Sequence, residues 1–313
     1  MNKEVLVTGG AGFIGSHFID YLLQNTSSNI TSVDCSSNYL EFLPSYKEVR
    51  FIQCDIKDKR QVDSLFDRKY DVIVHFAASS NINSSTKTML DTNIVGTFNL
   101  LEAVRANKAN KMIHLSTDKV YGSLACDEVP FTELSTINPS NLYTASKASA
   151  DMLVRAFSQT YQLPLITVRS SNNYGPRQQE NKFIPKTIMN ALKEKDILVY
   201  GDGLQVRDWL FVEDHCRAIY NVMESGSLGE VYNVGGGHER TSLQVVKLIL
   251  DHLDKSHKLI RHVEDRQIHE RRCALNWGKI QRELGWKPDI SFHSGLKQTI
   301  NWYTHNFVNG IRS

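Results

Sequence analysis

The stretch Gly9-Gly-Ala-Gly-Phe-Ile-Gly15 decides the fold. It follows a β-branched run at 5–8, which predicts a strand, and it opens the segment 13–24, whose apolar residues recur at helical spacing. Glycines at 9, 10, 12 and 15 allow a sharp turn and close approach of the backbone to a pyrophosphate, which a helix N-terminus attracts. This context predicts a dinucleotide-binding loop. A tight strand–helix turn without a ligand is the alternative.

The rest of the first half repeats the same alternation. Further short apolar runs lie at 29–33, 49–53, 72–76, 112–116 and 163–169, separated by helical or turn-rich sequence. Strands alternating with helices predict an α/β protein with a doubly wound parallel sheet of the Rossmann type. Asp34 follows the second run, 19 residues after Gly15. A carboxylate there accepts a hydrogen bond from a ribose 2′-hydroxyl and repels a 2′-phosphate, which favours NAD over NADP.

The pattern changes after about residue 175, where turn sequences such as Tyr174-Gly-Pro and Tyr200-Gly-Asp-Gly interrupt it. We therefore predict an NAD-binding domain at 1–175, to which 207–235 returns. A smaller substrate-binding lobe is predicted from 176–206 and 236–313.

Composition excludes several classes of protein. The chain has 313 residues, 41% of them hydrophobic, and a net charge of +2, which gives no electrostatic hold on nucleic acid or an anionic membrane. No apolar run is long enough to span a bilayer, and the N-terminal residues do not resemble a signal peptide. The five cysteines are scattered and the histidines show no metal-ligand spacing. We predict a cytoplasmic protein without a metal site.

Two further segments suggest chemistry. Tyr143-Thr-Ala-Ser-Lys147 places a phenol and an ammonium four residues apart, on one face of a helix. A nearby cation lowers the pKa of a phenol, so Tyr143 becomes a candidate base, although an ordinary exposed helix pair is the alternative. Ser116-Thr-Asp-Lys-Val-Tyr-Gly122 leaves the sheet at its carboxyl edge. There Asp118 and Lys119 can face the cofactor, or serve as a loop acid and a surface lysine.

With these motifs, the chain resembles the extended short-chain dehydrogenase/reductases. Three more stretches are similar to the nucleotide-sugar 4,6-dehydratases, with the dTDP-glucose enzymes as the most similar sub-family. These stretches are Ser171-Asn-Asn-Tyr-Gly-Pro176 with Lys182-Phe-Ile-Pro185, Tyr200-Gly-Asp-Gly-x-Gln-x-Arg-Asp-Trp209 with Val212-Glu-Asp-His215, and Tyr232-Asn-Val-Gly235. The resemblance extends through Leu284-Gly-Trp-Lys-Pro288, over nearly the whole chain.

The resemblance implies a mechanism. Tyr143, supported by Lys147, would take the C4 hydroxyl proton of a nucleotide sugar while NAD⁺ takes the C4 hydride, and Thr117 would hydrogen-bond the C4 oxygen. Asp118 would then protonate the departing C6 hydroxyl, and the hydride would return to C6. The product would be a 4-keto-6-deoxy sugar.

The same resemblance assigns binding residues. Those expected at the cofactor are Gly9, Gly12, Phe13, Ile14, Gly15, Asp34, Asp55, Ile56, Phe76, Ala77, Ala78, Asn93, Tyr143 and Lys147. Those expected at the substrate are Ser80, Asn81, Asn172, Lys182, Phe183, Tyr200, Arg207 and Arg266, with Arg207 at the diphosphate. The resemblance also implies a homodimer, in which helices at 93–106 and 143–161 from each subunit form a four-helix bundle.

Departures from the family pattern bear on the substrate. Lys119 stands where the dTDP-glucose enzymes have a glutamate that removes the C5 proton; a lysine can replace it as a neutral base, or stay protonated and stabilise the enolate. An Asp-Lys pair is similar to the CDP-glucose and UDP-N-acetylglucosamine dehydratases. Four further family residues are replaced by smaller or uncharged ones, Ser79, Asn81, Asn83 and Ser84. Smaller side chains can admit an acetamide, so we predict a slight preference for UDP-N-acetylglucosamine over dTDP-glucose.

Three other functions stay open. The same residues would serve a 5,6-dehydratase that returns the hydride to C4 and leaves an exocyclic alkene. A nucleotide-sugar 4-epimerase needs Tyr143 and Lys147 but usually has serine or threonine at position 118. A non-catalytic NAD sensor would be expected to have lost Tyr143 or Lys147, and both are present.

Overall fold

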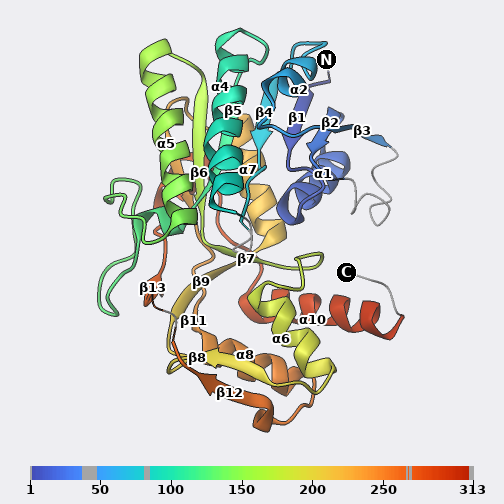
Figure 1. The fold of residues 1–313 in the computed structure, drawn as a ribbon, viewed down its shortest axis with the longest axis vertical. Helices are drawn as coiled ribbons and strands as arrows, with labels where there is room; N and C mark the ends of the chain where they lie inside the picture. Colours follow the sequence, from blue (N-terminus) through green and yellow to red (C-terminus); the bar gives the residue numbers. More distant parts are fainter. Residues whose placement is uncertain (1, 37–47, 81–84, 266, 268–269, 310–313) are drawn as a thin grey trace.

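The computed structural model describes residues 2–36, 48–80, 85–265, 267 and 270–309 (Figure 1). Its largest element is a seven-stranded parallel sheet. The strands are β1 (Glu4–Thr8), β2 (Asn29–Asp34), β3 (Arg50–Gln53), β4 (Val72–His75), β5 (Met112–Thr117), β6 (Leu165–Ser170) and β10 (Val231–Val234). They are ordered β10-β6-β5-β4-β1-β2-β3, so the direction of winding reverses between β1 and β4. Ligands of such sheets bind at the carboxyl ends of the strands beside this reversal.

Helices cover both faces of this sheet, as the sequence predicted. They are α1 (Phe13–Asn25), α2 (Lys59–Ser64), α3 (Thr86–Leu90), the π-helix η3 (Asp91–Gly96), α4 (Thr97–Arg105), α5 (Leu142–Tyr161), α7 (Val212–Ser225) and α9 (Gly278–Leu284). Along β1, Val5 and Val7 belong to the core packed by α1, α7 and α9, whereas Leu6 points into the core packed by α2, α4 and α5. This alternation is what a strand buried on both faces requires.

The six predicted strands of this sheet match the observed ones within two residues at each end, whereas β10 was not predicted as a strand. The fold class, a doubly wound parallel sheet, is confirmed. Within 207–235, β10 pairs with β6 in the main sheet and α7 packs on α1, whereas β9 (Val206–Phe211) belongs to a separate small sheet. The division of the chain into two domains stays a prediction.

The remaining elements lie below the carboxyl edge of the main sheet in Figure 1. One small sheet contains β9, β7 (Asn172–Tyr174), β11 (Glu239–Thr241) and β13 (Arg272–Cys273), and another pairs β8 (Ile197–Tyr200) with β12 (Ile260–Val263). The helices here are α6 (Phe183–Leu192), α8 (Ser242–His252), η5 (His257–Leu259) and α10 (Phe292–Val308). Tyr174, Trp209, Phe211 and Phe292 lie in a core of their own. β7 follows β6 directly and pairs with β9, and Leu124, in the chain after β5, forms a bridge with Arg272 of β13.

The described residues contain neither a membrane-spanning helix nor a metal-binding cluster. No helix in that part of the chain is long and apolar enough to cross a membrane. Over the same residues, no cluster of three or more histidine, cysteine, aspartate or glutamate side chains could hold a metal ion.

Candidate active site

The glycine loop joins β1 to α1 at the reversal of the sheet. Gly9 has φ of +71°, and a Cβ there would lie 2.6 Å from the amide nitrogen of Ala77, so the loop packs directly on the end of β4. A Cβ on Gly15 would lie 2.2 Å from the carbonyl oxygen of Gly9. Both positions therefore require glycine. The N-cap of α1 is Gly12, which offers no side-chain cap, and the first turn holds no acidic residue.

No side chain among the described residues therefore caps the amide groups of this first turn. Because the first N–H groups of a helix have no partner within the helix, and because its dipole is positive at this end, the loop fits a pyrophosphate. Asp34 ends β2 beside the loop, and its carboxylate accepts hydrogen bonds from the amides of Ala11 (3.1 Å) and Ser36 (3.2 Å). Burial raises the pKa of Asp34, although these two amides act in the opposite direction. Its position beside the loop fits the predicted ribose contact.

The chain after β4 is held at the same edge by a buried asparagine. Asn93, in the π-helix η3, accepts a hydrogen bond from the amide of Ser79 (2.7 Å) and donates to the Ser79 carbonyl oxygen (3.1 Å). Its amide also donates to Ser146 Oγ on α5 at 2.8 Å. Asn93 thereby ties the predicted cofactor segment 76–78 to the helix of Tyr143. It does so as a structural link, a role that the sequence analysis did not assign.

Tyr143 and Lys147 lie on α5, one turn apart, as the spacing predicted. Asn141 caps this helix by accepting from the Thr144 amide (3.1 Å), which fixes the turn that holds Tyr143. Lys147 is 4% exposed, and its Nζ donates to the carbonyl oxygen of Leu115 at 2.7 Å. The pair therefore sits against β5 at the carboxyl edge of the sheet.

The predicted lowering of the Tyr143 pKa is not found. Burial raises the pKa of Tyr143 to about 12, and the charge of Asp118 adds to this effect. Burial lowers the pKa of Lys147 to about 8, although Asp151 acts in the opposite direction. For both groups, desolvation by burial is the largest cause of the shift. A ligand that brings positive charge next to the phenol would be needed to ionise it.

Asp118 follows β5 and begins the short helix η4 (Asp118–Tyr121). It is 1% exposed; its Oδ1 accepts a hydrogen bond from Thr117 Oγ1 at 3.0 Å, and its Oδ2 has no partner among the described residues. Burial raises the pKa of Asp118, although the Lys119 charge acts against this. A buried carboxyl group with one uncommitted oxygen, close enough to Tyr143 to affect its ionisation, is suited to donate a proton to a ligand.

The charges of Lys119 and Arg207 act to lower the pKa of Asp118, and a third basic side chain, Lys182, lies close enough to Lys119 for the two charges to interact. Lys119 lies on η4, Lys182 precedes α6, and Arg207 lies on β9. Burial lowers the pKa of Lys182, and the charge of Lys119 adds to this effect. Lys182 Nζ also donates to Ser80 Oγ at 3.3 Å. Such a group of cations suits an anionic ligand such as a diphosphate.

The other predicted residues are spread more widely. Asp55 and Ile56 follow β3, and Ile56 is buried against Gly96, where a Cβ would lie 2.5 Å from it. Asn172 begins β7, and the ring of Phe183 stacks on Trp209 with 6.1 Å between centroids. Tyr200 ends β8, which pairs with β12 in the two-stranded sheet. Asn81 and Arg266, with Asn83 and Ser84, lie outside the described residues.

The sequence analysis missed one charged member of the site. Glu270 is 9% exposed, and its carboxylate lies 3.5 Å from the guanidinium of Arg207. It comes from a segment more than 60 residues away in the chain and belongs to no motif, so only the contact with Arg207 reveals it.

A parallel sheet with this winding, a glycine loop at its reversal and a Tyr-x-x-x-Lys pair at the same edge define the extended short-chain dehydrogenase/reductases. Comparison with known proteins narrows this class. The model of the GDP-mannose 4,6-dehydratase family matches residues 6–299. A dTDP-glucose 4,6-dehydratase of Neisseria gonorrhoeae is 44% identical, over 97% of this chain and 96% of the relative.

Solved structures agree. A dTDP-glucose 4,6-dehydratase of Bacillus anthracis, crystallised with NAD, is 41% identical, has a TM-score of 0.91, and covers 99% of this chain with 100% of its own. Its counterpart from Streptomyces venezuelae, also with NAD bound, is 38% identical with a TM-score of 0.92, over 97% of both chains. The chain belongs to the nucleotide-sugar 4,6-dehydratases, a family of NAD-dependent hydro-lyases.

Proposed function

We propose that the protein removes water across C5 and C6 of a nucleoside-diphosphate hexose through a transient C4 ketone, giving a 4-keto-6-deoxy sugar with NAD as cofactor. The observation that supports this best is Asp118. An epimerase needs no acid at this position, whereas elimination of the C6 hydroxyl requires one. Asp118 is buried, its pKa is raised by that burial, and its Oδ2 is uncommitted among the described residues.

The residues at the carboxyl edge fit NAD. The uncapped first turn of α1 would hold the pyrophosphate, and Asp34 the adenosine ribose. Bound NAD⁺ supplies a hydride acceptor and a positive charge beside the phenol of Tyr143.

The chain's own residues then divide the proton transfers. Tyr143 takes the proton of the C4 hydroxyl as C4 is oxidised, and the buried Lys147 stabilises the phenolate. Oxidation of C4 acidifies the C5 proton, and Asp118 protonates the C6 oxygen so that it leaves as water. The hydride that C6 gains would be supplied by the bound cofactor, and with a proton added at C5 the whole reaction has no net redox change.

Lys119 is our candidate for the base that removes the C5 proton. It lies next to Asp118 on η4 and faces the same group of charges. Lys119→Met is expected to abolish exchange of the C5 proton with deuterium from solvent, whereas Lys119→Glu, which introduces a carboxylate base, is expected to retain it. Exchange unaffected by Lys119→Met would assign the step to another residue.

A separate question is which nucleoside diphosphate and which hexose make up the substrate. The relatives reported above are named for dTDP-glucose and give no support to the predicted preference for UDP-N-acetylglucosamine. That preference rests on the sequence differences around Ser79, of which only Ser79 itself lies among the described residues. The substrate class that we propose is therefore the nucleoside-diphosphate hexose, and the experiment decides its base and sugar.

The test is to incubate the purified protein and NAD⁺ with UDP-N-acetylglucosamine, UDP-glucose, CDP-glucose and dTDP-glucose. We expect at least one to lose one water by mass spectrometry and to give a product that reacts as a ketone. Loss of water without a ketone would indicate the 5,6-alkene. Unchanged mass with inverted C4 would indicate an epimerase, and tight NAD binding with no turnover would indicate a sensor.

We also propose a homodimer formed through α5 and the helix of η3 and α4. Large apolar side chains on these neighbouring helices are exposed, namely Val95, Phe98, Met152 and Tyr161. A second copy of the chain would remove this apolar area from water. Light scattering should give twice the 35.6 kDa of one chain.

Val95→Glu with Phe98→Glu should halve the mass measured by light scattering. Leu198→Glu, at an exposed leucine on β8 in the two-stranded sheet, should leave it unchanged. A wild-type protein that scatters as a monomer would refute the dimer.

A further inference from the structure

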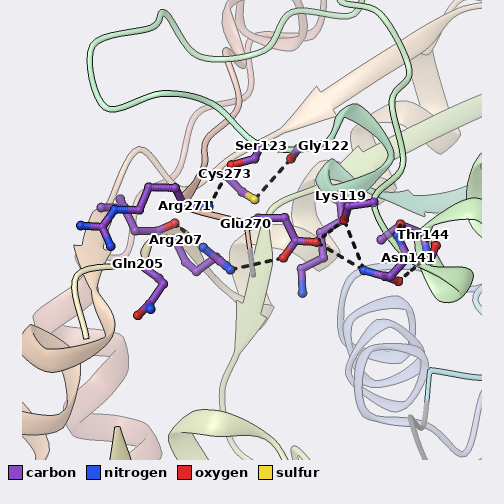
Figure 2. Close-up of polar contacts among 12 residues, drawn as sticks. Lys119, Gly122, Ser123, Asn141, Thr144, Gln205, Arg207, Glu270, Arg271 and Cys273 are labelled. Carbon is purple, nitrogen blue, oxygen red and sulfur yellow. Dashed lines mark hydrogen bonds and ion pairs between the residues drawn. The ribbon is translucent and has the colours of Figure 1, made fainter. Parts of the chain in front are cut away.

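Glu270 lies between the substrate end of the site and the catalytic helix. Figure 2 shows its carboxylate with Arg207 on one side and Asn141 on the other, and with Lys119 nearby. The side chain is buried, so its charge must be balanced by these neighbours rather than by water.

One oxygen of Glu270 is bound to the start of α5. Its Oε1 accepts hydrogen bonds from Ser140 Oγ at 2.6 Å and from Asn141 Nδ2 at 3.3 Å. Asn141 is the N-cap of α5 and forms a reciprocal capping box with Thr144. Tyr143 is two residues further along, so Glu270 contacts the turn that positions the phenol.

The other oxygen faces the predicted diphosphate site. Arg207 Nη2 lies 3.5 Å from Glu270 Oε2, while Arg207 Nη1 donates to the carbonyl oxygen of Val206 at 2.8 Å. The guanidinium is thereby restrained on two sides. Its planar, forked group keeps further N–H donors for a phosphate.

The backbone around Glu270 connects the same two regions. On one side, the Val206 amide donates to the Arg271 carbonyl oxygen at 2.8 Å, and β13 pairs with β9. On the other, the Arg271 amide donates to Ser123 Oγ at 2.8 Å, in the chain that follows η4 (Figure 2). The position of Glu270 is thus fixed from its own backbone as well as through its side chain.

Charge keeps the carboxyl group of Glu270 ionised. Burial alone would raise its pKa, but the Ser140 hydrogen bond and the charges of Lys119 and Arg207 outweigh this, and the pKa lies below its usual range. An ionised Glu270 can accept hydrogen bonds from Ser140 and Asn141 and pair with Arg207 at the same time.

We propose that Glu270 is a positioning residue, which sets the distance between the diphosphate group held at Arg207 and the phenol of Tyr143. This rests on the proposed function. A nucleotide sugar bound at its diphosphate presents C4 to Tyr143 only if the two ends of the site keep their spacing. An error of about 1 Å in such a spacing can lower a rate by about 10²-fold.

The first test is Glu270→Gln in the full-length enzyme with whichever sugar the wild type dehydrates. Glutamine can still accept from Ser140, but its uncharged amide loses the ion pair with Arg207. We expect kcat to fall by about tenfold to 10²-fold. We expect the inhibition constant of the free nucleoside diphosphate to change less than about threefold, because a repulsive charge and an orienting partner are lost together.

A double-mutant cycle tests whether Glu270 affects kcat through Arg207. In an Arg207→Lys background, which lacks the forked group, Glu270→Gln should lower kcat much less than in the wild type. The matched control is Glu239→Gln in the same small sheet. It removes the ion pair that Glu239 forms with Arg272 through two hydrogen bonds of 2.6 and 2.8 Å. It should leave kcat within about twofold, because both oxygens of the Glu239 carboxylate bind Arg272.

Other outcomes overturn the proposal. A kcat within twofold of wild type in Glu270→Gln, or equal effects in the wild-type and Arg207→Lys backgrounds, would reject a link through Arg207. An equal loss of kcat in Glu239→Gln would show a general effect on the small sheet. A wild type that dehydrates no nucleotide sugar would instead reject the proposed function.

Discussion

The cofactor half and the substrate half of the site are built in different ways. Around the glycine loop, Gly9, Asp34 and Asn93 each contact backbone groups of neighbouring elements at one sheet edge. Around Asp118, charged side chains arrive from segments far apart in the chain, and Arg207 with Glu270 shows the pattern. The first half is determined by local spacing and the second by tertiary packing. Tyr143 and Asp118 lie where the two halves meet.

Loss of the phenol should have the largest effect, because Tyr143 joins both halves. Tyr143→Phe should lower the rate of dehydration by about 10³-fold, since it removes the group that accepts the C4 proton. NAD binding, measured by calorimetry, should stay within about threefold. The matched control is Tyr21→Phe on α1, whose ring packs on Tyr220, and its activity should be unchanged. A Tyr143→Phe enzyme with normal turnover would remove the phenol from the mechanism.

A substitution at Asp118 should separate C4 oxidation from the elimination of the C6 hydroxyl. Asp118→Asn should lower product formation by about 10²-fold, while reduced nicotinamide, followed by its absorbance, accumulates because C4 oxidation does not need the acid. Since burial raises the pKa of Asp118, the ionised form costs stability as the pH rises from the unfolded to the folded pKa. The variant should therefore melt above the wild type at neutral pH.

The exposed Asp127→Asn serves as its control and should change neither rate nor melting temperature. A rate for Asp118→Asn equal to that of the wild type would favour an epimerase.

The cofactor half also contains a buried ion pair, which we expect to affect the stability of the fold rather than the reaction. Asp151 on α5 lies 2.8 Å from Arg169 and 3.2 Å from His114, all of them buried. Asp151→Asn leaves the guanidinium without its partner and should lower the free energy of unfolding by about 3 kcal/mol in urea titrations.

Burial would raise the pKa of Asp151, but His114 and Arg169 outweigh it and hold the pKa low. The difference between wild type and Asp151→Asn should therefore be full at neutral pH and shrink as the pH falls through that folded-state pKa. The exposed pair of Asp63 with Lys59 is the control, because Asp63→Asn should cost less than about 1 kcal/mol. Equal costs would show that burial does not matter here.

The smallest effect is expected at Asp34, on the outer side of the cofactor half. Asp34→Ser should lower the preference for NAD over NADP by about tenfold, because it removes both a hydrogen-bond acceptor and a repulsive charge. The ratio of kcat/KM values for the two cofactors measures this. An unchanged ratio would mean that Asp34 acts only on the amides of Ala11 and Ser36.

The same comparison explains what the sequence could predict. The strands and α1 were found because hydrophobic periodicity encodes burial on two faces, and the glycine loop because Gly9 and Gly15 have no substitute at those contacts. The placement of Tyr143 and Lys147 followed from helical spacing. The ionisation of Tyr143 was predicted wrongly, because the desolvation that raises its pKa depends on how deeply α5 is buried.

Glu270 could not be found in this way. Its contacts with Arg207 and Ser140 join residues 63 and 130 positions apart. No local pattern marks such a residue, since its role follows from the pairing of β13 with β9. The π-helical turn at Asp91–Gly96 was missed for a related reason, because the apolar spacing at 93–106 is also compatible with a regular helix.

The π-helical turn makes the long helix of α3, η3 and α4 sensitive to insertion or deletion of a single residue. A wide turn contains one residue more than an α-helical turn, and each residue advances the helix by about 100°. Deleting a single residue there would restore a regular helix and rotate everything before it relative to α4. Asn93 would then turn away from Ser79 and Ser146 while Phe98 kept its place on the outer surface. Insertions and deletions in this short turn would thus reorient the part of the helix that precedes it while α4 stays in place.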